Sequence, residues 1–112
     1  MIKDIVSFPD FGKLDLRVGK VTKAEVVEGS KNLVRMSVDL GSDIGVRKIL
    51  AGIGEWYKPQ DIKGKKFIFV ANLAPKQMMK EMSQGMILVA EFGESFALIP
   101  IDKKIPEGSV VR

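Results

Sequence analysis

The sequence predicts an all-β fold, a five-stranded Greek-key barrel with a short helix and with extensions at both ends. Two observations predict it. Short apolar runs recur along the 112 residues and are separated by turns that contain glycine, as is typical of strands. One stretch with helical signals, around Pro59, stands between the third and fourth runs. Three strands, a short helix and further strands are the element order of the OB-fold.

The N-terminal residues predict one helical turn and then a long strand. Ser7 can cap a helical turn in which Phe8 and Phe11 are expected to point inward. Residues 14–18 alternate apolar and polar side chains, which predicts a strand. The alternation loses its phase after Gly19, which predicts a bulge or a sharp bend there.

A hairpin is predicted in the middle of the chain. Residues 34–40 alternate apolar and polar side chains without interruption and form the clearest strand pattern of the sequence. A glycine-containing turn at 41–45 leads into a return strand at 46–53, and residues 29–32 form the turn before the pair.

The second half predicts one helix and three apolar strands. Pro59 favours one or two helical turns that end near Gly64. The tail 104–111 is expected to lie along the barrel or across a partner. Strands are predicted at 67–73, 86–91 and 96–101, with a turn at Gly93-Glu94 between the last two.

Composition indicates a single globular domain, residues 1–112, without catalytic machinery. Hydrophobic residues make up 46% of the chain and charged residues 29%, which argues against disorder. Cysteine and histidine are both absent, so thiolate nucleophiles, imidazole bases, disulfides and the usual zinc ligands are excluded. We therefore expect no enzyme activity and no cofactor. No membrane span or signal-peptide pattern is evident, and a cytoplasmic location is the expectation.

The positive charge is concentrated in one segment. The net charge is +4, but residues 58–80 alone carry +5, because six lysines there face a single acidic residue, Asp61. Such clustering is typical of a phosphate-binding surface. The lysines are Lys58, Lys63, Lys65, Lys66, Lys76 and Lys80.

The stretch 70–86 is a long polar connection of the kind that carries binding groups on a rigid scaffold. Binding of RNA requires cations for phosphates and hydrogen-bonding groups for bases or ribose hydroxyls. This stretch offers both, as do the polar side of the first two strands and the loop between them. The candidate RNA-binding residues are Arg17, Lys31, Asn32, Arg35, Asn72, Lys76, Lys80, Ser83, Gln84, Gly85 and Met86.

Several residues have two interpretations. Asn72 either pins the following loop or meets RNA, and Met86 is interpreted as a core or rim residue. Gly85 is expected to let RNA approach closely, so that Gly85→Val would block binding with little change in melting temperature. Trp56 and Tyr57 either stack on bases or pack beneath the helix.

Four ordered motifs carry a family resemblance: Asp15–Gly19, Ala71–Leu73, Pro75-Lys76 and Ser83–Met86. Together they resemble the tRNA-binding domain found at the C-terminus of many methionyl-tRNA synthetases and also as a free-standing protein or β subunit. The resemblance implies non-catalytic binding of tRNA through its folded shape and backbone. It also implies a homodimer that acts with methionyl-tRNA synthetase or another synthetase.

Two departures from that pattern leave an alternative open. Lys31-Asn32 stands where many relatives have an Asp-Lys pair, and Met79-Lys80 replaces the arginine-glycine of synthetase-attached members. The amino-acid sequence of residues 74–84 and 44–62 also resembles that of the CsaA-type secretion chaperones. This resemblance implies a dimer that binds unfolded polypeptide. A general single-strand-binding protein is a third hypothesis, disfavoured because aromatic residues make up only 7% of the chain.

Continuous apolar runs in the C-terminal third independently predict a dimer. Residues 86–90 and 97–101, together with the tail, exceed what a small barrel has room to bury. A two-fold interface built from this third of the chain is the expectation.

Overall fold

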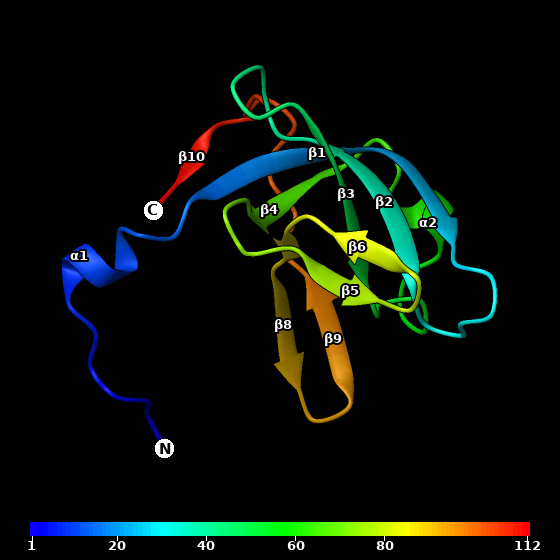
Figure 1. Cartoon of the computed structure of the whole chain (residues 1–112), viewed down its shortest axis with the longest axis horizontal. Helices are drawn as coiled ribbons and strands as arrows, with labels where there is room; N and C mark the ends of the chain where they lie inside the picture. The colour runs from blue at the N-terminus through cyan, green and yellow to red at the C-terminus, as the bar shows by residue number, and fades with distance from the viewer.

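Five antiparallel strands form a nearly closed barrel, in the order β3–β2–β1–β4–β7 (Figure 1). The computed structural model covers residues 1–112. The predicted OB-like, mainly β fold is confirmed. The strands are β1 Leu16–Val26, β2 Val34–Asp39, β3 Val46–Ala51, β4 Lys66–Val70 and β7 Met86–Ile87.

Strand β1 belongs to both walls of the barrel. Its first half pairs with β4, and its second half pairs with β2 across a register shift between Val21 and Lys23. The irregularity therefore lies after Gly19 and not at it. Gly19 is needed for space, since a Cβ there would lie 2.6 Å from both the Phe69 ring and the Val38 side chain.

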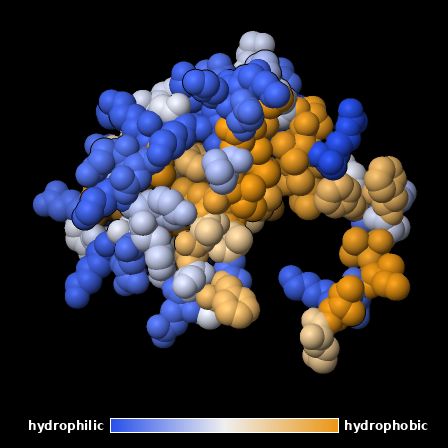
Figure 2. Space-filling model, turned by 180° about the vertical axis from the view of Figure 1, so that it is seen from behind, coloured by the Kyte–Doolittle hydropathy of each residue, from blue (hydrophilic) through white to orange (hydrophobic).

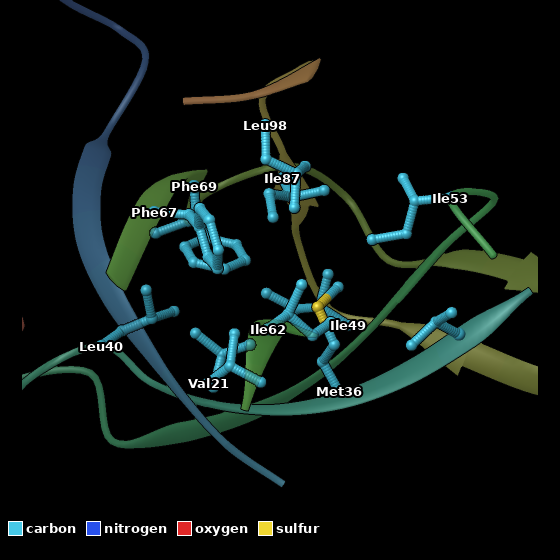
Figure 3. Close-up of a cluster of buried hydrophobic side chains, with 13 residues drawn as sticks. Val21, Met36, Leu40, Ile49, Ile53, Ile62, Phe67, Phe69, Ile87 and Leu98 are labelled. Carbon is cyan, nitrogen blue, oxygen red and sulfur yellow. The ribbon is translucent and has the colours of Figure 1, made fainter. Parts of the chain in front are cut away.

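The core consists of the side chains that the strands direct inward (Figure 3). In β2 the alternation is strict, and Val34, Met36 and Val38 are fully buried. The predicted helix is present as α2, Pro59–Ile62, and it contributes Ile62 to the core. The larger core residues are Phe67, Phe69, Met36, Leu40, Ile49, Ile53 and Ile62.

The barrel closes between β3 and the segment 83–85 without a regular strand ladder. The backbone N–H of Leu50 donates to Ser83 Oγ at 3.0 Å. The Lys48 N–H donates to Gln84 Oε1 at 3.1 Å, and the Gln84 N–H donates back to the Lys48 carbonyl at 2.8 Å. Side-chain oxygens thus replace part of the ladder, and we call residues 83–85 the closing seam.

Two hairpins leave the barrel on either side of this seam (Figure 1). The first joins β5, Lys76–Met78, to β6, Glu81–Ser83, within the stretch that the sequence predicts as a long polar connection. The second joins β8, Val89–Phe92, to β9, Ser95–Leu98. Its turn at Gly93-Glu94 was expected, but the predicted strand 86–91 is divided into β7 and β8.

The two ends of the chain behave differently. Helix α1, Phe8–Phe11, is capped by Ser7 as predicted, yet Phe8 is 84% exposed and Phe11 39% exposed. The prediction that both point inward is wrong, because residues 1–14 form an arm that extends away from the barrel (Figure 1). The C-terminal strand β10, Val110–Val111, pairs with β1, so the tail lies along its own barrel. Neither α1 nor α2, at four residues each, could span a membrane.

Candidate nucleic-acid interface

The outer face of strands β1, β2 and β3 is rich in cations. Because side chains alternate along a strand, burial of Met36 and Val38 inside the barrel directs Arg35 and Ser37 outward. The register places Lys23, Ser37 and Lys48 side by side across the three strands. Arg35 lies next to this row, opposite Glu25.

The β5–β6 hairpin folds over one end of this outer face. Met78 packs on a small second core made of Val27, Leu33 and Leu50. Lys80, at the tip of the hairpin, lines the same surface hollow as Arg35. The hairpin therefore adds its exposed lysines to the cations of the sheet.

Arg35 is held in an ion cluster. Its Nε donates to Glu81 Oε1 at 2.7 Å, its Nη2 donates to Glu81 Oε2, and its Nη1 donates to Glu25 at 2.8 Å. Lys48 Nζ lies 3.3 Å from Glu81 Oε1. The hydrogen bond from Arg35 holds the pKa of Glu81 at about 2, below its ordinary value of 4.5.

Lys31 and Asn32 lie in the loop between β1 and β2, as predicted. The Asn32 carbonyl accepts a hydrogen bond from the Gly54 N–H at 2.7 Å, which ties this loop to the end of β3. Lys31 lines a hollow together with Lys58 and Tyr57. One lysine of the basic segment thus lies close to the loop cation.

Arg17 and Asn72 lie at the opposite end of β1 and hold parts of the chain together. Arg17 donates to Asp15, Asp43 and the carbonyl of Gly108, and hydrogen bonds to these two carboxylates raise its pKa. Asn72 Oδ1 accepts from the Asp15 N–H at 2.8 Å, and its Nδ2 donates to the Lys13 carbonyl at 2.6 Å. Both side chains therefore have structural partners.

Most of the 83–86 motif is committed to barrel closure. Ser83 is 3% exposed, and its Oγ also donates to the Gly85 carbonyl at 3.0 Å. Gly85 has φ = 146°, and a Cβ there would lie 3.0 Å from both Ile49 Cδ1 and the Val70 carbonyl oxygen. The glycine makes room for the protein's own backbone and core, so the structure does not support the expected neutral effect of Gly85→Val on melting.

Met86 lies at the rim of an apolar groove. The residue is 45% exposed, and the groove beside it has a volume of about 270 Å³. Its walls come from β3, the segment 73–78, the seam and the β8–β9 hairpin. Apolar lining residues include Leu50, Ile53, Leu73, Met86, Ile87 and Phe96.

The two aromatic candidates pack within the protein. The Trp56 ring stacks on Phe96 of β9 with centroids 4.3 Å apart and an interplanar angle of 18°. The Tyr57 hydroxyl accepts a hydrogen bond from the Leu98 N–H at 3.0 Å. Both residues therefore anchor the β8–β9 hairpin.

The basic segment divides between separate places on the surface. Lys76 and Lys80 belong to the β5–β6 hairpin, whereas Lys65 and Lys66 line another hollow with Lys20 and Lys103. Lys66 has structural partners there, because its Nζ donates hydrogen bonds to the carbonyls of Lys103 and Ile105. The clustering in sequence is therefore only partly a clustering in space.

Comparison with known proteins identifies the family. Residues 16–110 match the family model described as "Putative tRNA binding domain". The chain belongs to this tRNA-binding domain family. The resemblance carried by the four motifs is thereby confirmed.

Relatives of this tRNA-binding domain are synthetases and small proteins of similar length. The methionine–tRNA ligase of Clostridium acetobutylicum is 44% identical over 113 residues, which include 99% of this chain but only 17% of the ligase. A MetRS-related protein from Pyrococcus horikoshii has 37% identity and a TM-score of 0.92, over 98% of this chain and 100% of its own. The chaperone CsaA from Bacillus anthracis has 28% identity and a TM-score of 0.86, over 97% and 100%.

Three cations of this tRNA-binding domain escape prediction from its motifs: Lys23 and Lys48 on the outer face, and Arg47 beside the closing seam. Arg47 Nη1 donates to the Ala71 carbonyl at 3.3 Å, close to the seam. A signal for Lys48 is present in the sequence, because burial of Ile49 requires its neighbour in the strand to face outward. Lys23 follows the register shift, which hides its orientation from a simple alternation.

Proposed function

We propose that this chain is a non-catalytic module that binds tRNA by its backbone and folded shape. The observation that carries the proposal is the row of cations on the outer face, extended by Lys31 at one side and by Lys76 and Lys80 on the hairpin. An array of lysines and arginines recognises phosphates without reading bases. Membership of the tRNA-binding domain family supports tRNA as the RNA.

The arrangement of aromatic residues supports shape recognition over base stacking. Single-strand-binding proteins present aromatic rings on which successive bases stack. Here Trp56 and Tyr57 are engaged by the β8–β9 hairpin. Phosphate contacts spread over a rigid surface instead suit a folded RNA.

The test is the salt dependence of tRNA binding. Each phosphate contact contributes about 0.7 to 0.9 to the slope of log affinity against log salt concentration. Lys31→Ala and Lys80→Ala should each weaken binding and flatten the slope by about that amount. Filter binding with tRNA, single-stranded DNA and an unfolded polypeptide measures affinity and preference together.

Lys3→Ala is the matched control. It removes the same charge from the N-terminal arm, far from the β1–β2 loop in Figure 1. It should leave the slope unchanged. Binding that does not respond to salt, or no binding of tRNA below high micromolar concentrations, contradicts the proposal.

We further propose that the module is a homodimer. Apolar side chains are exposed on the arm and on the neighbouring side of the body, with an open hollow between them (Figure 2). The exposed residues include Ile5, Phe8, Phe92, Ile99 and Val110. A second copy that covers this apolar surface would bring two RNA-binding faces into one particle, and a second contact then becomes effectively intramolecular.

Sedimentation tests the dimer. The wild type should sediment as a dimer at tens of micromolar, and Phe8→Ser with Phe92→Ser should shift it toward the monomer without unfolding it. A wild-type monomer at that concentration contradicts the dimer. Deletion of residues 104–112 is unsuitable as a test, since the tail pairs with its own β1.

The relatives support a proposal for the partner. The chain spans 17% of the length of the methionine–tRNA ligases that it matches, so we propose that it supplies tRNA affinity to a methionyl-tRNA synthetase, as a subunit or an attached module, in the cytoplasm. Addition of the chain to a synthetase that lacks such a domain should lower the KM for tRNA. An unchanged KM for tRNA would contradict the proposal that a methionyl-tRNA synthetase is the partner.

The apolar groove favours a second candidate, a chaperone of the CsaA type. Its lining of Leu50, Ile53, Leu73 and Met86 suits an apolar peptide side chain. In that case Met86→Ser should abolish suppression of aggregation and leave tRNA binding intact. Loss of aggregation suppression in a protein that never binds tRNA would favour the chaperone.

A further inference from the structure

Glu81 occupies two of the cations that an RNA-binding face needs. Its two carboxylate oxygens accept hydrogen bonds from Nε and Nη2 of Arg35, and Lys48 Nζ lies 3.3 Å from Oε1. The Glu81 side chain is only 19% exposed. Each nitrogen of the Arg35 guanidinium therefore donates one hydrogen bond, because Nη1 donates to Glu25.

The carboxylate holds these cations with the geometry that a phosphate uses. A guanidinium presents two parallel N–H groups that fit carboxylate and phosphate oxygens equally well. With Lys48 beside the same oxygen, two cations face this one anion, while Glu25 pairs with the remaining nitrogen of Arg35. In the free protein that anion is Glu81.

Departure of Glu81 requires movement of one side chain and not of the whole hairpin. Met78 remains packed on Val27, Leu33 and Leu50, and Ser83 Oγ remains bonded to the Leu50 N–H. These contacts fix both strands of the hairpin independently of Glu81. The site can therefore open while Lys76 and Lys80 keep their positions.

We propose that Glu81 is a built-in competitor of RNA: it occupies an anion site formed by Arg35 and Lys48, and a phosphodiester group of bound RNA replaces it there. This inference rests on the proposed tRNA binding. It assigns Glu81 as the residue that limits affinity, because every RNA molecule must displace an intramolecular carboxylate before these two cations contribute.

The test is tRNA binding by Glu81→Gln over a range of salt concentrations. The amide keeps the shape and loses the charge, so affinity should rise several-fold. The salt slope should steepen by about 0.7 to 0.9, which corresponds to one further phosphate contact. Glu91→Gln is the matched control, since it makes the same charge change on an exposed residue of β8 and should have little effect.

A second variant identifies the site. In the Arg35→Gln background, Glu81→Gln should give a much smaller gain, and Lys48→Gln should cost more affinity in the Glu81→Gln protein than in the wild type. Hydrogen exchange of β5 and β6 reports whether the hairpin stays in place. If the hairpin of Glu81→Gln loosens, the proposal still requires that Lys48→Gln cost more affinity in the Glu81→Gln protein than in the wild type.

Three results overturn the inference. Lower affinity of Glu81→Gln for tRNA would show that the carboxylate stabilises the β5–β6 hairpin in its binding position and does not compete with RNA. Equal gains from Glu81→Gln and Glu91→Gln would reduce the effect to net charge. Absence of tRNA binding by the wild type would remove the proposed function as well, whereas the first two results leave that function standing.

Discussion

The two hairpins share a topology but differ in what holds them to the barrel. The β5–β6 hairpin lies on the outer face through Met78 and through the ion pairs of Glu81. The β8–β9 hairpin projects from the barrel, with Phe92 89% exposed, and is held near its base by the stack of Phe96 on Trp56 (Figure 1). One hairpin therefore presents charge to solvent, and the other presents apolar surface.

This difference indicates that the two hairpins suit different ligands. Lysines and an exchangeable carboxylate suit an anionic ligand, whereas an exposed phenylalanine beside an apolar groove suits a protein surface. The closing seam lies between the hairpins and positions both. Changes at the seam should disturb both hairpins, and changes within one hairpin should leave the other intact.

The largest effect is expected from Gly85→Val at the seam. A side chain at φ = 146° is strained, and its Cβ would press on Ile49 and on the Val70 carbonyl. Strain and overpacking together should cost about 2–4 kcal/mol of unfolding free energy. Urea unfolding measures it, with Gly52→Val as the control, because a Cβ at Gly52 meets nothing within 4 Å. Equal stability of Gly85→Val and Gly52→Val would contradict the tight packing inferred at the closing seam.

Met78→Ala should loosen the β5–β6 hairpin alone. Met78 is half-buried against the second core, so its truncation should cost about 1–2 kcal/mol, below the range for a fully buried methionine. Hydrogen exchange should increase in β5 and β6 and remain unchanged in β8 and β9. Met82→Ala, at a 45% exposed position of β6, is the control. Faster exchange in both hairpins would show that they are coupled.

Trp56→Ala should loosen the β8–β9 hairpin alone. Loss of the ring stack itself should cost about 0.5–1.5 kcal/mol. Loss of the buried part of the ring adds to this cost, since Trp56 is only 36% exposed. Melting curves and tRNA binding measured on the same sample separate the effects. Stability should fall while the affinity for tRNA stays at the wild-type value, and a parallel fall in affinity would place Trp56 at the RNA surface.

The smallest effect is expected from acid. Because Arg35 lowers the pKa of Glu81 from 4.5 to about 2, the folded state binds this proton more weakly than the unfolded state does. The stabilising contribution is therefore complete above pH 4.5 and is lost as the pH falls toward 2. Melting temperatures measured across this range should fall less for Glu81→Gln than for Glu91→Gln. Identical pH profiles would contradict the strength of this ion pair.

Elements specified by neighbouring residues could be predicted from the sequence. The alternation of residues 34–40 gives β2, Pro59 gives α2, and Gly93-Glu94 gives the turn of the second hairpin. These signals are local, since strand alternation and turn chemistry depend on a few adjacent positions. The β5–β6 hairpin has no such signal, because Glu81 finds its partner Arg35 46 positions away.

The sequence by itself determined the family, the order of strands and helix along the chain, and the excess of lysine in residues 58–80. Only the tertiary structure decided which candidates are available to a ligand: Lys31, Lys76 and Lys80 are exposed, Arg17 and Arg35 are paired, and Ser83 is buried in the seam. The physical reason is that a charge or a hydroxyl acts through the groups within a few ångströms of it. In this barrel those groups come from distant parts of the chain, so their pairing exists only after the strands have closed.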